Sequence, residues 1–431
     1  KKISTNLNFD SILDTFVIND HIYISGKKTL SKEVTQIKIV KGKINENQIV
    51  FENLIELSSN KCMFTHSVHS GKIQSFNDNE EKLLSNFNEN YELINEIYLS
   101  LNRLKEKKEE GYWSNISSED QESFLSMCDE VGTLKAIKVN FPELEEMIYE
   151  PARSVGLKLL DIKSDHIGID YGCMWGNMLI QSAKKCKHMV GVDQTLDSLK
   201  FLQKRVFEEQ LDNVSLVHQN LRNEIELSNC FDFAIINGVL EWIPDTNQIE
   251  LSKFFKKYKD KIEKSAKSPT DLQLDFLKKV HQNLNKNGKL YLAIENRWDY
   301  QHFLWKRDPH SNLFFTAILP RGLANLISRI YYGRPYVNYI YSYKELETLL
   351  KAAGFSTVDK YAAFPDYHIP QMILDLKNKD TSNFRSLYKS GPTKNIVKKI
   401  FRKIRYTLDF IIYKKMKSFN FSPAIIIIAK K

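Results

Sequence analysis

The sequence predicts an α/β fold in which a largely parallel sheet is covered by helices on both faces. The first supporting observation is an apolar run that ends in Asp170 and continues into a turn with Gly172 and Gly176. The second is another apolar run, which follows a helix-like segment and ends in Asp193. This order of strand, tight turn, helix, strand and acid is typical of a βαβ unit that binds a nucleotide. The glycines admit the ligand, and the carboxylate accepts hydrogen bonds from a ribose.

The alternation of strand-like and helix-like segments continues to the end of the chain and gives seven strands in all. After Asp193 we expect a helix over 195–210, with Thr195 as its N-cap. A capping box of Ser342 and Glu345 predicts the start of a later helix, which ends at Gly354. The remaining expected elements are strands at 214–218, 231–237, 289–295, 356–364 and 423–429, and a helix near 271–284.

The 431 residues are enough for two or three folded units. Residues 1–75 alternate apolar and polar positions in short runs separated by turn residues, which predicts a small β-rich module. Residues 76–150 are expected to be a helical connector, with one helix over 77–110 because its apolar residues recur at spacings of three and four. Residues 151–431 then form the main domain, with insertions at 296–341 and 378–420.

Composition and charge narrow the class of protein. The hydrophobic content of 42% supports a globular core, and no apolar run approaches the roughly 18 residues that span a bilayer. Five cysteines without CxxC spacing are typical of reduced thiols. We therefore expect a cytoplasmic protein with neither disulfides nor a zinc site, and the sequence assigns no metal site. The net charge of +9 fits a nucleic acid, an anionic lipid surface or an acidic substrate.

Four sequence features carry a resemblance to a known family. They are Asp-x-Gly-x-x-x-Gly at 170–176, Asp193, the turn Gln219-Asn220, and Phe-Asp-Phe-Ala-Ile-Ile-Asn-Gly-Val-Leu-Glu-Trp-Ile-Pro at 231–244. With them, residues 145–376 and 423–431 resemble the class I S-adenosylmethionine-dependent methyltransferases. That resemblance implies a seven-stranded Rossmann-like sheet, here with the N-terminal β-rich module and helical additions.

Later motifs resemble one branch of that family, found with bacterial surface-polysaccharide and O-antigen biosynthesis. These motifs are Ile294-Glu295-Asn296-Arg297, Asp308-Pro309-His310, Tyr341-Ser342 and Phe-Pro-Asp-Tyr-x-x-Pro at 364–370. The resemblance implies a methyltransferase that acts on a glycan or lipid-linked glycan, with S-adenosylmethionine as its cofactor.

The resemblance also implies a cofactor-binding set at the carboxyl ends of the strands. Its members, in chain order, are Asp170, Gly172, Gly176, Asp193, Asn220, Asn237 and Gly238. The first turn would hold the methionine part, Asp193 would accept hydrogen bonds from the ribose, and Asn220 would lie beside the adenine. Asn237 and Gly238 would form the floor of the pocket.

Two residues differ from the family pattern. Met174 stands where the family usually has a third glycine; if this position needs a positive φ, a methionine costs on the order of 1 kcal/mol of strain. Asn220 stands where an aspartate is common, yet its amide oxygen still accepts a hydrogen bond. Met174 is the main support for one alternative, a catalytically dead scaffold that keeps the methyltransferase fold.

Methyl transfer from a sulfonium to a hydroxyl needs a base as well as correct positioning of the acceptor. Candidates on loops after the strand ends are Glu241, Glu295, His310, Asp366 and His368. We predict His310 as the catalytic base, because an imidazole titrates near neutrality, with Glu295 and Asp366 as further catalytic residues. A surface histidine and an Asp-capped turn are the alternative interpretations of His310 and Asp366.

Two residues are predicted to bind the acceptor. Arg297 suits a phosphate or carboxylate, and Tyr367 beside Asp366 suits sugar hydroxyls. An alternative for Arg297 is an ion pair with Glu295 that anchors the loop. The insertion 296–341, rich in aromatic residues and arginine, is expected to form a lid over the acceptor.

Residues 394–419 carry apolar positions at helical spacing among lysines and arginines. Such a basic amphipathic helix fits the surface of an anionic membrane, which would place the protein at the inner membrane face. The alternative is that the apolar stripe packs on the N-terminal units while the lysines face water.

The sequence thus predicts an S-adenosylmethionine-dependent methyltransferase that O-methylates a sugar or another hydroxyl or acid group of a surface-glycan precursor. An RNA methyltransferase is the rival enzyme class, because the chain is basic. It is disfavoured because the strand that ends at Asn237 continues as Gly-Val-Leu and lacks the Asn/Asp-Pro-Pro-aromatic motif that grips a flipped base.

Overall fold

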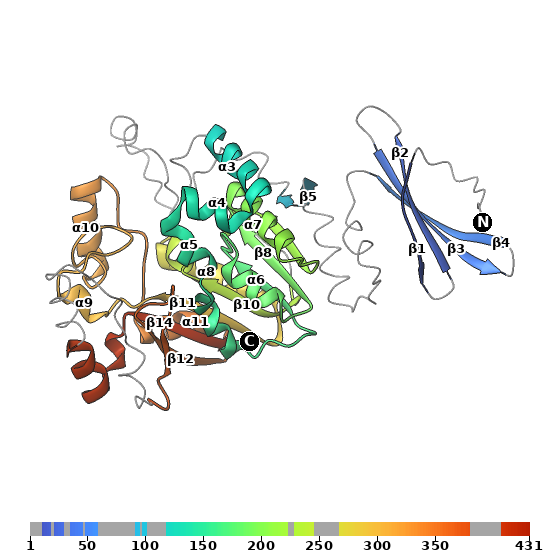
Figure 1. Cartoon of the computed structure of the whole chain (residues 1–431). Coiled ribbons are helices and arrows are strands. Elements are labelled where there is room, and N and C mark those ends of the chain that lie inside the picture. The colour runs from blue at the N-terminus through green and yellow to red at the C-terminus, as the bar shows by residue number, and fades with distance from the viewer. Residues whose placement is uncertain are drawn as a thin grey trace. The chain divides into compact units, whose positions relative to one another are not determined.

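The computed structural model describes residues 118–222, 228–244, 267–379 and 407–431, together with the strands that lie between residues 11 and 100. The chain forms two compact units, Lys1–Leu104 and Lys105–Lys431 (Figure 1). The boundary between them falls inside the segment expected to be a connector.

The described part of the first unit consists of β-strands. β1 (Ser11–Ile18), β2 (His21–Thr29), β3 (Thr35–Asn45) and β4 (Gln48–Ser58) pair in sequence order as an antiparallel sheet. Between two and five residues separate neighbouring strands, and this order of pairing is that of a β-meander. This sheet agrees with the β-rich character expected for residues 1–75.

Residues 91–100 correct the expectation of a helix over 77–110. They form a β-hairpin, with β5 (Tyr91–Ile94) antiparallel to β6 (Ile97–Ser100). Aromatic and β-branched residues in this segment favour strands, and the two residues between β5 and β6 give the length of a tight hairpin loop. Apolar spacing of three and four is compatible with both structures, so it does not decide between them. The rest of 77–110 lies outside the described residues.

The second unit contains the sheet that the sequence predicts. Its described strands lie in the order β13-β12-β14-β11-β10-β7-β8-β9. Parallel pairing runs from β11 to β9, and β14 is antiparallel to both of its neighbours. The seven-stranded Rossmann-like sheet is confirmed, with the short β13 added beside β12. The strands are β7 (Ile167–Tyr171), β8 (His188–Asp193), β9 (Val214–His218), β10 (Phe231–Asn237), β11 (Leu284–Glu295), β12 (Thr357–Phe364), β13 (Met372–Asp375) and β14 (Ala424–Lys430).

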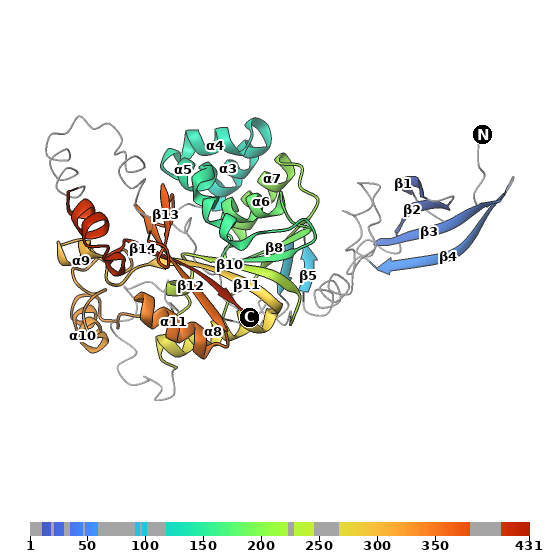
Figure 2. The same cartoon turned by 90° about the horizontal axis from the view of Figure 1, so that it is seen from below.

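Helices cover both faces of this sheet. Figure 2 shows α4, α6 and α7 on one side and α8 and α11 on the other. The α-helices are α3 (Ser118–Val131), α4 (Thr133–Asn140), α5 (Glu145–Tyr149), α6 (Asn177–Ala183), α7 (Leu196–Glu208), α8 (Pro269–Asn283), α9 (Tyr300–Phe303), α10 (Arg321–Tyr332) and α11 (Tyr343–Ala352). Shorter helical segments are η3 (Pro142–Leu144), η4 (Pro151–Leu160), η5 (Leu240–Trp242), η7 (Phe410–Lys415) and η8 (Phe419–Phe421).

Local hydrogen bonds explain where several helices begin. The Ser342 hydroxyl accepts from the Glu345 amide, and the Glu345 carboxylate accepts from the Ser342 amide at 2.8 Å, so the predicted capping box is confirmed. A second capping box, of Ser268 and Asp271, begins α8. Thr195 occupies the predicted N-cap position of α7, but its side chain makes no capping hydrogen bond.

A nearly continuous apolar core holds the sheet. Almost every residue of β7, β8, β10 and β14 is buried, as expected for strands with a layer of structure on each face. Such strands carry few polar side chains along their length. Polar groups therefore gather where the strands end, at the edge of the sheet where parallel α/β folds bind ligands.

The two insertions differ in how much of them the structure describes. The first contains α9 and α10, and a β-bridge between Asn296 and Tyr341 closes its ends. In the second, residues 380–406 lie outside the described residues, with much of the apolar stripe of 394–419. At its described end, Leu408 packs against a cluster within the second unit that includes Tyr413. Of the helices in the described ranges, none is apolar over a length that would reach across a bilayer.

We expect Gly168→Ala to destabilise the second unit. A Cβ at Gly168 would overlap the Phe233 ring and lie 2.6 Å from Met189 Sδ. Overpacking of this kind costs about 1–3 kcal/mol, which lowers the midpoint of thermal unfolding, measured by circular dichroism, by a few degrees.

The matched control for this substitution is Gly322→Ala in α10. A Cβ there would meet nothing within 4 Å, and alanine favours a helix. A Gly168→Ala protein that melts at the parent temperature would contradict the packing between β7 and its neighbours.

Candidate active site

The candidate site lies where β7, β8, β10 and β11 end. Asp170, Asp193, Asn237 and Glu295 stand at or next to these ends. The parallel register brings the ends together: Tyr171 pairs with Val192 on β8 and with Ile236 on β10, and Asn237 pairs with Ala293 on β11. Polar residues far apart in the sequence therefore share one edge of the sheet.

The turn after β7 has the left-handed backbone that the sequence suggests. Gly172 and Gly176 have φ angles of +74° and +80°, and Met174 has a φ of +46°. Met174 therefore occupies a conformation that favours glycine, which costs on the order of 1 kcal/mol. Its side chain packs against a hydrophobic cluster that includes Phe201. A Cβ at Gly172 would lie 2.5 Å from Val239 Cγ2, so this turn touches the segment that follows β10.

The carboxylate of Asp193 ties this turn to the start of α7. Its Oδ2 accepts a hydrogen bond from the Met174 amide and its Oδ1 accepts one from the Thr195 amide, both at 2.8 Å. Burial raises the pKa of Asp193, while these two backbone hydrogen bonds act to lower it. Each carboxylate oxygen has a further lone pair. The group can therefore accept hydrogen bonds from ribose hydroxyls and keep the turn in place.

Asp170, just before the turn, is a buried carboxyl group. Burial raises its pKa to about 7; the charge of Arg153 lowers this pKa and the charge of Asp193 raises it. A cation bound beside Asp170 would favour the ionised form. This residue is therefore suited to a positively charged part of a ligand.

The expected floor of the cofactor pocket has unsatisfied polar atoms. Both Nδ2 and Oδ1 of Asn237 are buried and have no hydrogen-bond partner in the described part of the chain. A ligand that supplies a donor and an acceptor would satisfy this amide, so the residue fits the predicted role. Beside it, a Cβ at Gly238 would overlap the Tyr367 hydroxyl. Asn220 accepts a hydrogen bond from the Arg222 amide at 3.0 Å, which forms a turn after β9.

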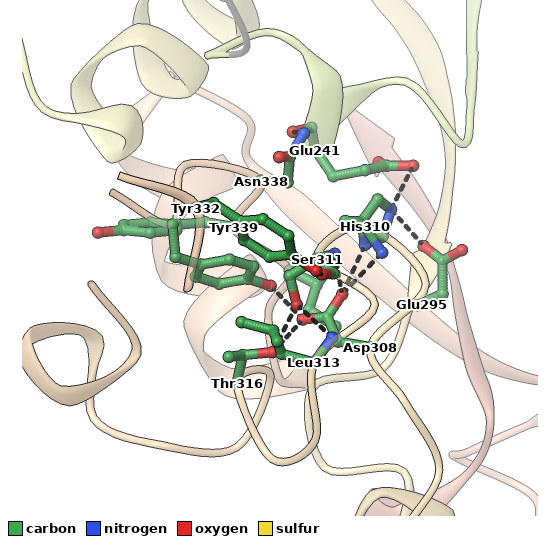
Figure 3. Close-up of polar contacts among 12 residues, drawn as sticks. Glu241, Glu295, Asp308, His310, Ser311, Leu313, Thr316, Tyr332, Asn338 and Tyr339 are labelled. Carbon is green, nitrogen blue, oxygen red and sulfur yellow. Dashed lines mark hydrogen bonds and ion pairs between the residues drawn. The ribbon is translucent and has the colours of Figure 1, made fainter. Parts of the chain in front are cut away.

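Next to this floor lies a group that we call the acid cluster: Glu241, Glu295, Asp308 and His310 (Figure 3). His310 Nε2 is 3.8 Å from Glu241 Oε1 and 3.8 Å from Glu295 Oε2. His310 Nδ1 is 3.4 Å from Asp308 Oδ1. The His310 side chain is 3% exposed and Glu241 is fully buried. The structure thus brings together two predicted residues, Glu295 and His310, and excludes a surface histidine.

The electrostatics of the acid cluster correct one expectation. Burial acts to lower the pKa of His310, but Asp308, Glu241 and Glu295 together raise it well above its usual value. Burial raises the pKa of Glu295, and the charge of Glu241 raises it further. Burial also acts to raise the pKa of Asp308, but His310 holds it at about 2. The expected titration of His310 near neutrality is therefore wrong, because carboxylates surround the imidazole.

Hydrogen bonds to both carboxylate oxygens fix Asp308 in place. Its Oδ2 accepts from the Tyr336 hydroxyl at 2.7 Å and from the Thr316 hydroxyl at 3.2 Å, and its Oδ1 accepts from the His310 amide at 2.8 Å. Tyr336 and Thr316 belong to the insertion 296–341. This part of the insertion therefore orients Asp308, and through Asp308 the acid cluster.

Tyr367 connects the acid cluster to the floor of the cofactor pocket. Its hydroxyl donates a hydrogen bond to Glu295 Oε1 at 3.1 Å, and its ring packs against Gly238. Tyr367 is buried. The hydroxyl proton of Tyr367 is directed to Glu295 and not to a sugar hydroxyl, so the structure assigns Tyr367 to the positioning of Glu295.

Arg297 has a structural role where the sequence suggests acceptor binding. Its side chain is 10% exposed. Its Nε and Nη2 donate to the carbonyls of Ala317 and Leu319 at 3.0 and 2.9 Å, and its Nη1 pairs with Glu345. The acceptor-binding prediction is corrected for this reason. The alternative ion pair with Glu295 is also wrong, because the partner is Glu345 on α11.

Asp366 lies outside the acid cluster. Its side chain is 49% exposed, and its Oδ1 accepts hydrogen bonds from the amides of His368 and Ile369 at 2.8 and 3.0 Å. This is the Asp-capped turn that the sequence offers as the alternative. The catalytic prediction for Asp366 therefore finds no support in the geometry.

Sequence reasoning names Asp308 only as part of the Asp308-Pro309-His310 motif and assigns no role in orienting the acid cluster to Asp308, Tyr336 or Asn338. Asp308 carries one signal that could have found it, since an aspartate two residues before His310 is typical of a turn in which the side chain accepts the backbone amide. Tyr336 and Asn338 carry no such local signal. Asn338 donates to the Glu241 carbonyl at 3.2 Å across a long stretch of sequence.

Residues 162–317 match the family model of a methyltransferase domain, over about a third of the chain. This region includes the turn after β7, Asp193, Asn237 and the acid cluster. The chain therefore contains a methyltransferase domain. The predicted fold class and the predicted type of domain are confirmed, and S-adenosylmethionine as the expected cofactor agrees with them.

Among curated proteins, the chain is similar to the 23S rRNA (uracil(1939)-C(5))-methyltransferase RlmD of Vibrio parahaemolyticus, with 26% identity over 87 residues. The protein of the same name from Vibrio campbellii is 28% identical over 87 residues. Each similarity covers 20% of this chain and 20% of the relative. The chain thus spans about a fifth of the length of the curated relatives it matches.

Solved structures are similar to this chain at low identity. Phosphoethanolamine N-methyltransferase 2 of Haemonchus contortus, in complex with S-adenosylmethionine, is 15% identical with a TM-score of 0.38, over 74% of this chain and 61% of that chain. The YcgJ protein of Bacillus subtilis is 12% identical with a TM-score of 0.35, over 66% of this chain and 99% of that chain. Neither likeness bears on the acceptor.

We expect Arg297→Gln to destabilise the methyltransferase domain. The substitution removes the guanidinium from its carbonyl partners and leaves Glu345 without its ion pair, which costs on the order of 2–4 kcal/mol. Urea unfolding measures the loss. Lys344→Gln, at an exposed position of α11, is the control and should stay within about 0.5 kcal/mol of the parent. Parent-like stability of Arg297→Gln would contradict the anchoring role.

Proposed function

We propose that this chain is an S-adenosylmethionine-dependent methyltransferase that methylates an oxygen of a sugar or acid group in a surface-glycan precursor. The position of Tyr367 carries the proposal. This residue packs on Gly238, in the expected floor of the cofactor pocket, and donates to Glu295 of the acid cluster. A methyl donor held over that floor would therefore face buried carboxylates.

The residues at the strand ends fit such a donor. Asp193 would accept hydrogen bonds from the ribose, Asn237 would use its unpaired amide atoms, and Asp170 would face the ammonium of the methionine part. The bound sulfonium supplies an electron-poor methyl carbon. The task of the protein is to align an acceptor atom with that carbon and to exclude water.

An oxygen acceptor fits the acid cluster. A hydroxyl gives up its proton as its oxygen attacks the methyl group, so it needs a proton acceptor within hydrogen-bond reach. Glu241 and Glu295 each have a buried carboxylate oxygen without a hydrogen-bond partner among the described residues. These oxygens are available to a hydroxyl, and Tyr367 and His310 hold Glu295 in place.

The domain also has a basic pocket, whose lining contains none of the residues of the acid cluster or of the strand ends. It has a volume of about 710 Å³, and its wall includes Trp298, whose ring can stack on a sugar. Five lysines line it: Lys344, Lys360, Lys377, Lys379 and Lys417. Lys360 and Lys377 already pair with nearby carboxylates. Binding of a negatively charged acceptor would therefore depend on Lys344, Lys379 and Lys417. Phosphates or carboxylates of a glycan precursor would pair with such ammonium groups.

The short similarity to the Vibrio rRNA methyltransferases favours RNA as a second candidate acceptor. The names of those proteins specify C5 of uracil as the methylated atom. This ring carbon becomes nucleophilic once a thiolate adds to the ring. All four described cysteines are buried, and burial raises the pKa of Cys128, Cys173 and Cys186. These cysteines are therefore unsuited to the same reaction.

We expect label from methyl-labelled S-adenosylmethionine to enter lipid-linked surface glycan when the full chain is incubated with it. Asp193→Asn should slow the transfer at least tenfold, because an amide accepts fewer hydrogen bonds from the ribose and the turn. Circular dichroism checks that this variant is folded. Label in 23S rRNA instead of glycan would overturn the proposed acceptor, and failure to bind the donor would favour the scaffold alternative.

We expect S-adenosylmethionine to bind more tightly at pH 7.0 than at pH 5.5. The pKa of Asp170 is raised to about 7, so its carboxyl is mostly protonated at pH 5.5 and half ionised at pH 7.0. The ionised form attracts the ammonium of the donor, which stays protonated over this range. Isothermal titration should show a roughly tenfold lower Kd at the higher pH.

Two controls isolate this effect. The ligand 5′-methylthioadenosine lacks the ammonium, and Asp170→Asn lacks the titrating group, so both should give nearly flat profiles between the two pH values. The same tenfold change with 5′-methylthioadenosine would contradict the assignment to Asp170.

A further inference from the structure

We propose that the acid cluster binds a divalent metal ion, with Mn²⁺ as the best-suited ion, through Glu241, Glu295 and His310. The existence of this metal site follows from the cluster itself. Its use in catalysis rests on the proposed function.

The spacing of the three ligands fits one ion. A carboxylate oxygen of Glu241, one of Glu295 and a ring nitrogen of His310 all lie within 4.8 Å of one another. The two separations from His310 Nε2 are 3.8 Å each, too long for hydrogen bonds. Atoms that share an octahedral ion at about 2.1 Å lie roughly 3.0 Å apart when adjacent and roughly 4.2 Å apart when opposite. The two separations from His310 Nε2 fall within this range.

Glu241 gives independent support for a ligand. It is 0% exposed, and neither of its carboxylate oxygens has a hydrogen-bond partner among the described residues. Figure 3 shows its carboxylate directed toward His310. Glu295 Oε2 faces the same ring nitrogen, Nε2, and it is also buried without a hydrogen-bond partner among the described residues. Buried carboxylates are normally paired or coordinate metals, and one ion between these oxygens would satisfy both side chains.

The surrounding hydrogen bonds hold the ligand atoms toward the same point. Tyr367 donates to Glu295 Oε1, which leaves Oε2 on the side of His310. Asp308 lies 3.4 Å from His310 Nδ1, so Nε2 is the nitrogen that faces Glu241 and Glu295. A carboxylate behind a histidine, on the nitrogen opposite the metal, is the usual arrangement around ligating imidazoles.

The charge of the acid cluster also favours a cation. Three carboxylates, those of Glu241, Glu295 and Asp308, face one imidazole. One imidazole can balance the charge of one carboxylate at most. An ion pair within the cluster therefore leaves charge uncompensated, which is costly in a buried place.

The donor set indicates the class of ion. Carboxylate oxygens suit Mg²⁺, Ca²⁺ and Mn²⁺, and imidazole nitrogen suits first-row transition ions. Mn²⁺ accepts both kinds of ligand. Three protein ligands would leave positions on the ion for water or for oxygens of the acceptor.

With the ion bound, Glu241 and Glu295 would act as its ligands and would not take the proton directly. The ion would coordinate the acceptor oxygen and promote loss of its proton to water, under the proposed function. The oxygen then forms its bond to the methyl carbon while the carbon–sulfur bond breaks, and that electron pair stays on sulfur. Glu241, Glu295 and His310 would keep their places as ligands throughout. The methyl group and the acceptor are thus brought together without any change in oxidation state of the ion.

Titration of the full, chelator-treated chain with Mn²⁺ alone tests this site. The electron paramagnetic resonance signal of free Mn²⁺ should report one bound ion per chain. Glu241→Gln and His310→Gln should each weaken the affinity at least tenfold. Coupling of the bound ion to an imidazole nitrogen should be present in the parent and lost in His310→Gln.

Glu347→Gln is the matched control, because it makes the same change at an ion-paired glutamate of α11. It should bind Mn²⁺ like the parent, and circular dichroism should show all variants folded. No stoichiometric binding, or parent-like binding by both cluster variants, would overturn the proposal. Methyl transfer that persists in chelator would contradict a catalytic role of the metal and leave the proposed function in place. Mn²⁺ binding without methyl transfer would support the metal site and contradict the proposed function.

Discussion

The candidate site depends on one buried side chain, Tyr367. Its ring packs on Gly238 after β10, and its hydroxyl donates to Glu295 at the end of β11. A single residue from the loop after β12 thus joins the expected cofactor floor to the acid cluster. A side chain at position 238 would displace the ring, and loss of the hydroxyl would free Glu295 from the orientation that directs Oε2 toward His310.

Much of the fold could be predicted because its determinants are local. The apolar runs of β7 and β8, the glycine-containing turn between β7 and α6, and the capping box at Ser342 are each visible within a few residues. The strand order then follows from the constraints on parallel α/β connections. Residues 91–100 could not be assigned in the same way. Their apolar spacing fits a helix and a hairpin alike, so pairing between strands decides the structure.

The candidate site was predictable where chemistry and position coincide. His310 and Glu295 were chosen as polar residues after strand ends, and the fold brings them together. Arg297 was misassigned because its partner, Glu345, comes from a helix far along the chain. The raised pKa of His310 could not be predicted from the local sequence, because burial and three carboxylates from separate segments determine it. Local sequence reveals the candidates, whereas long-range contacts decide their roles.

The central claim is that the strand-end pocket and the acid cluster form one active site. A crystal structure of the full chain with S-adenosylhomocysteine tests it most directly. The account predicts the ribose on Asp193, the amide of Asn237 in contact with the ligand, and the sulfur turned toward Glu241, Glu295 and His310. A ligand whose sulfur faces away from these three residues, or that binds outside the ends of β7 and β10, would contradict the account.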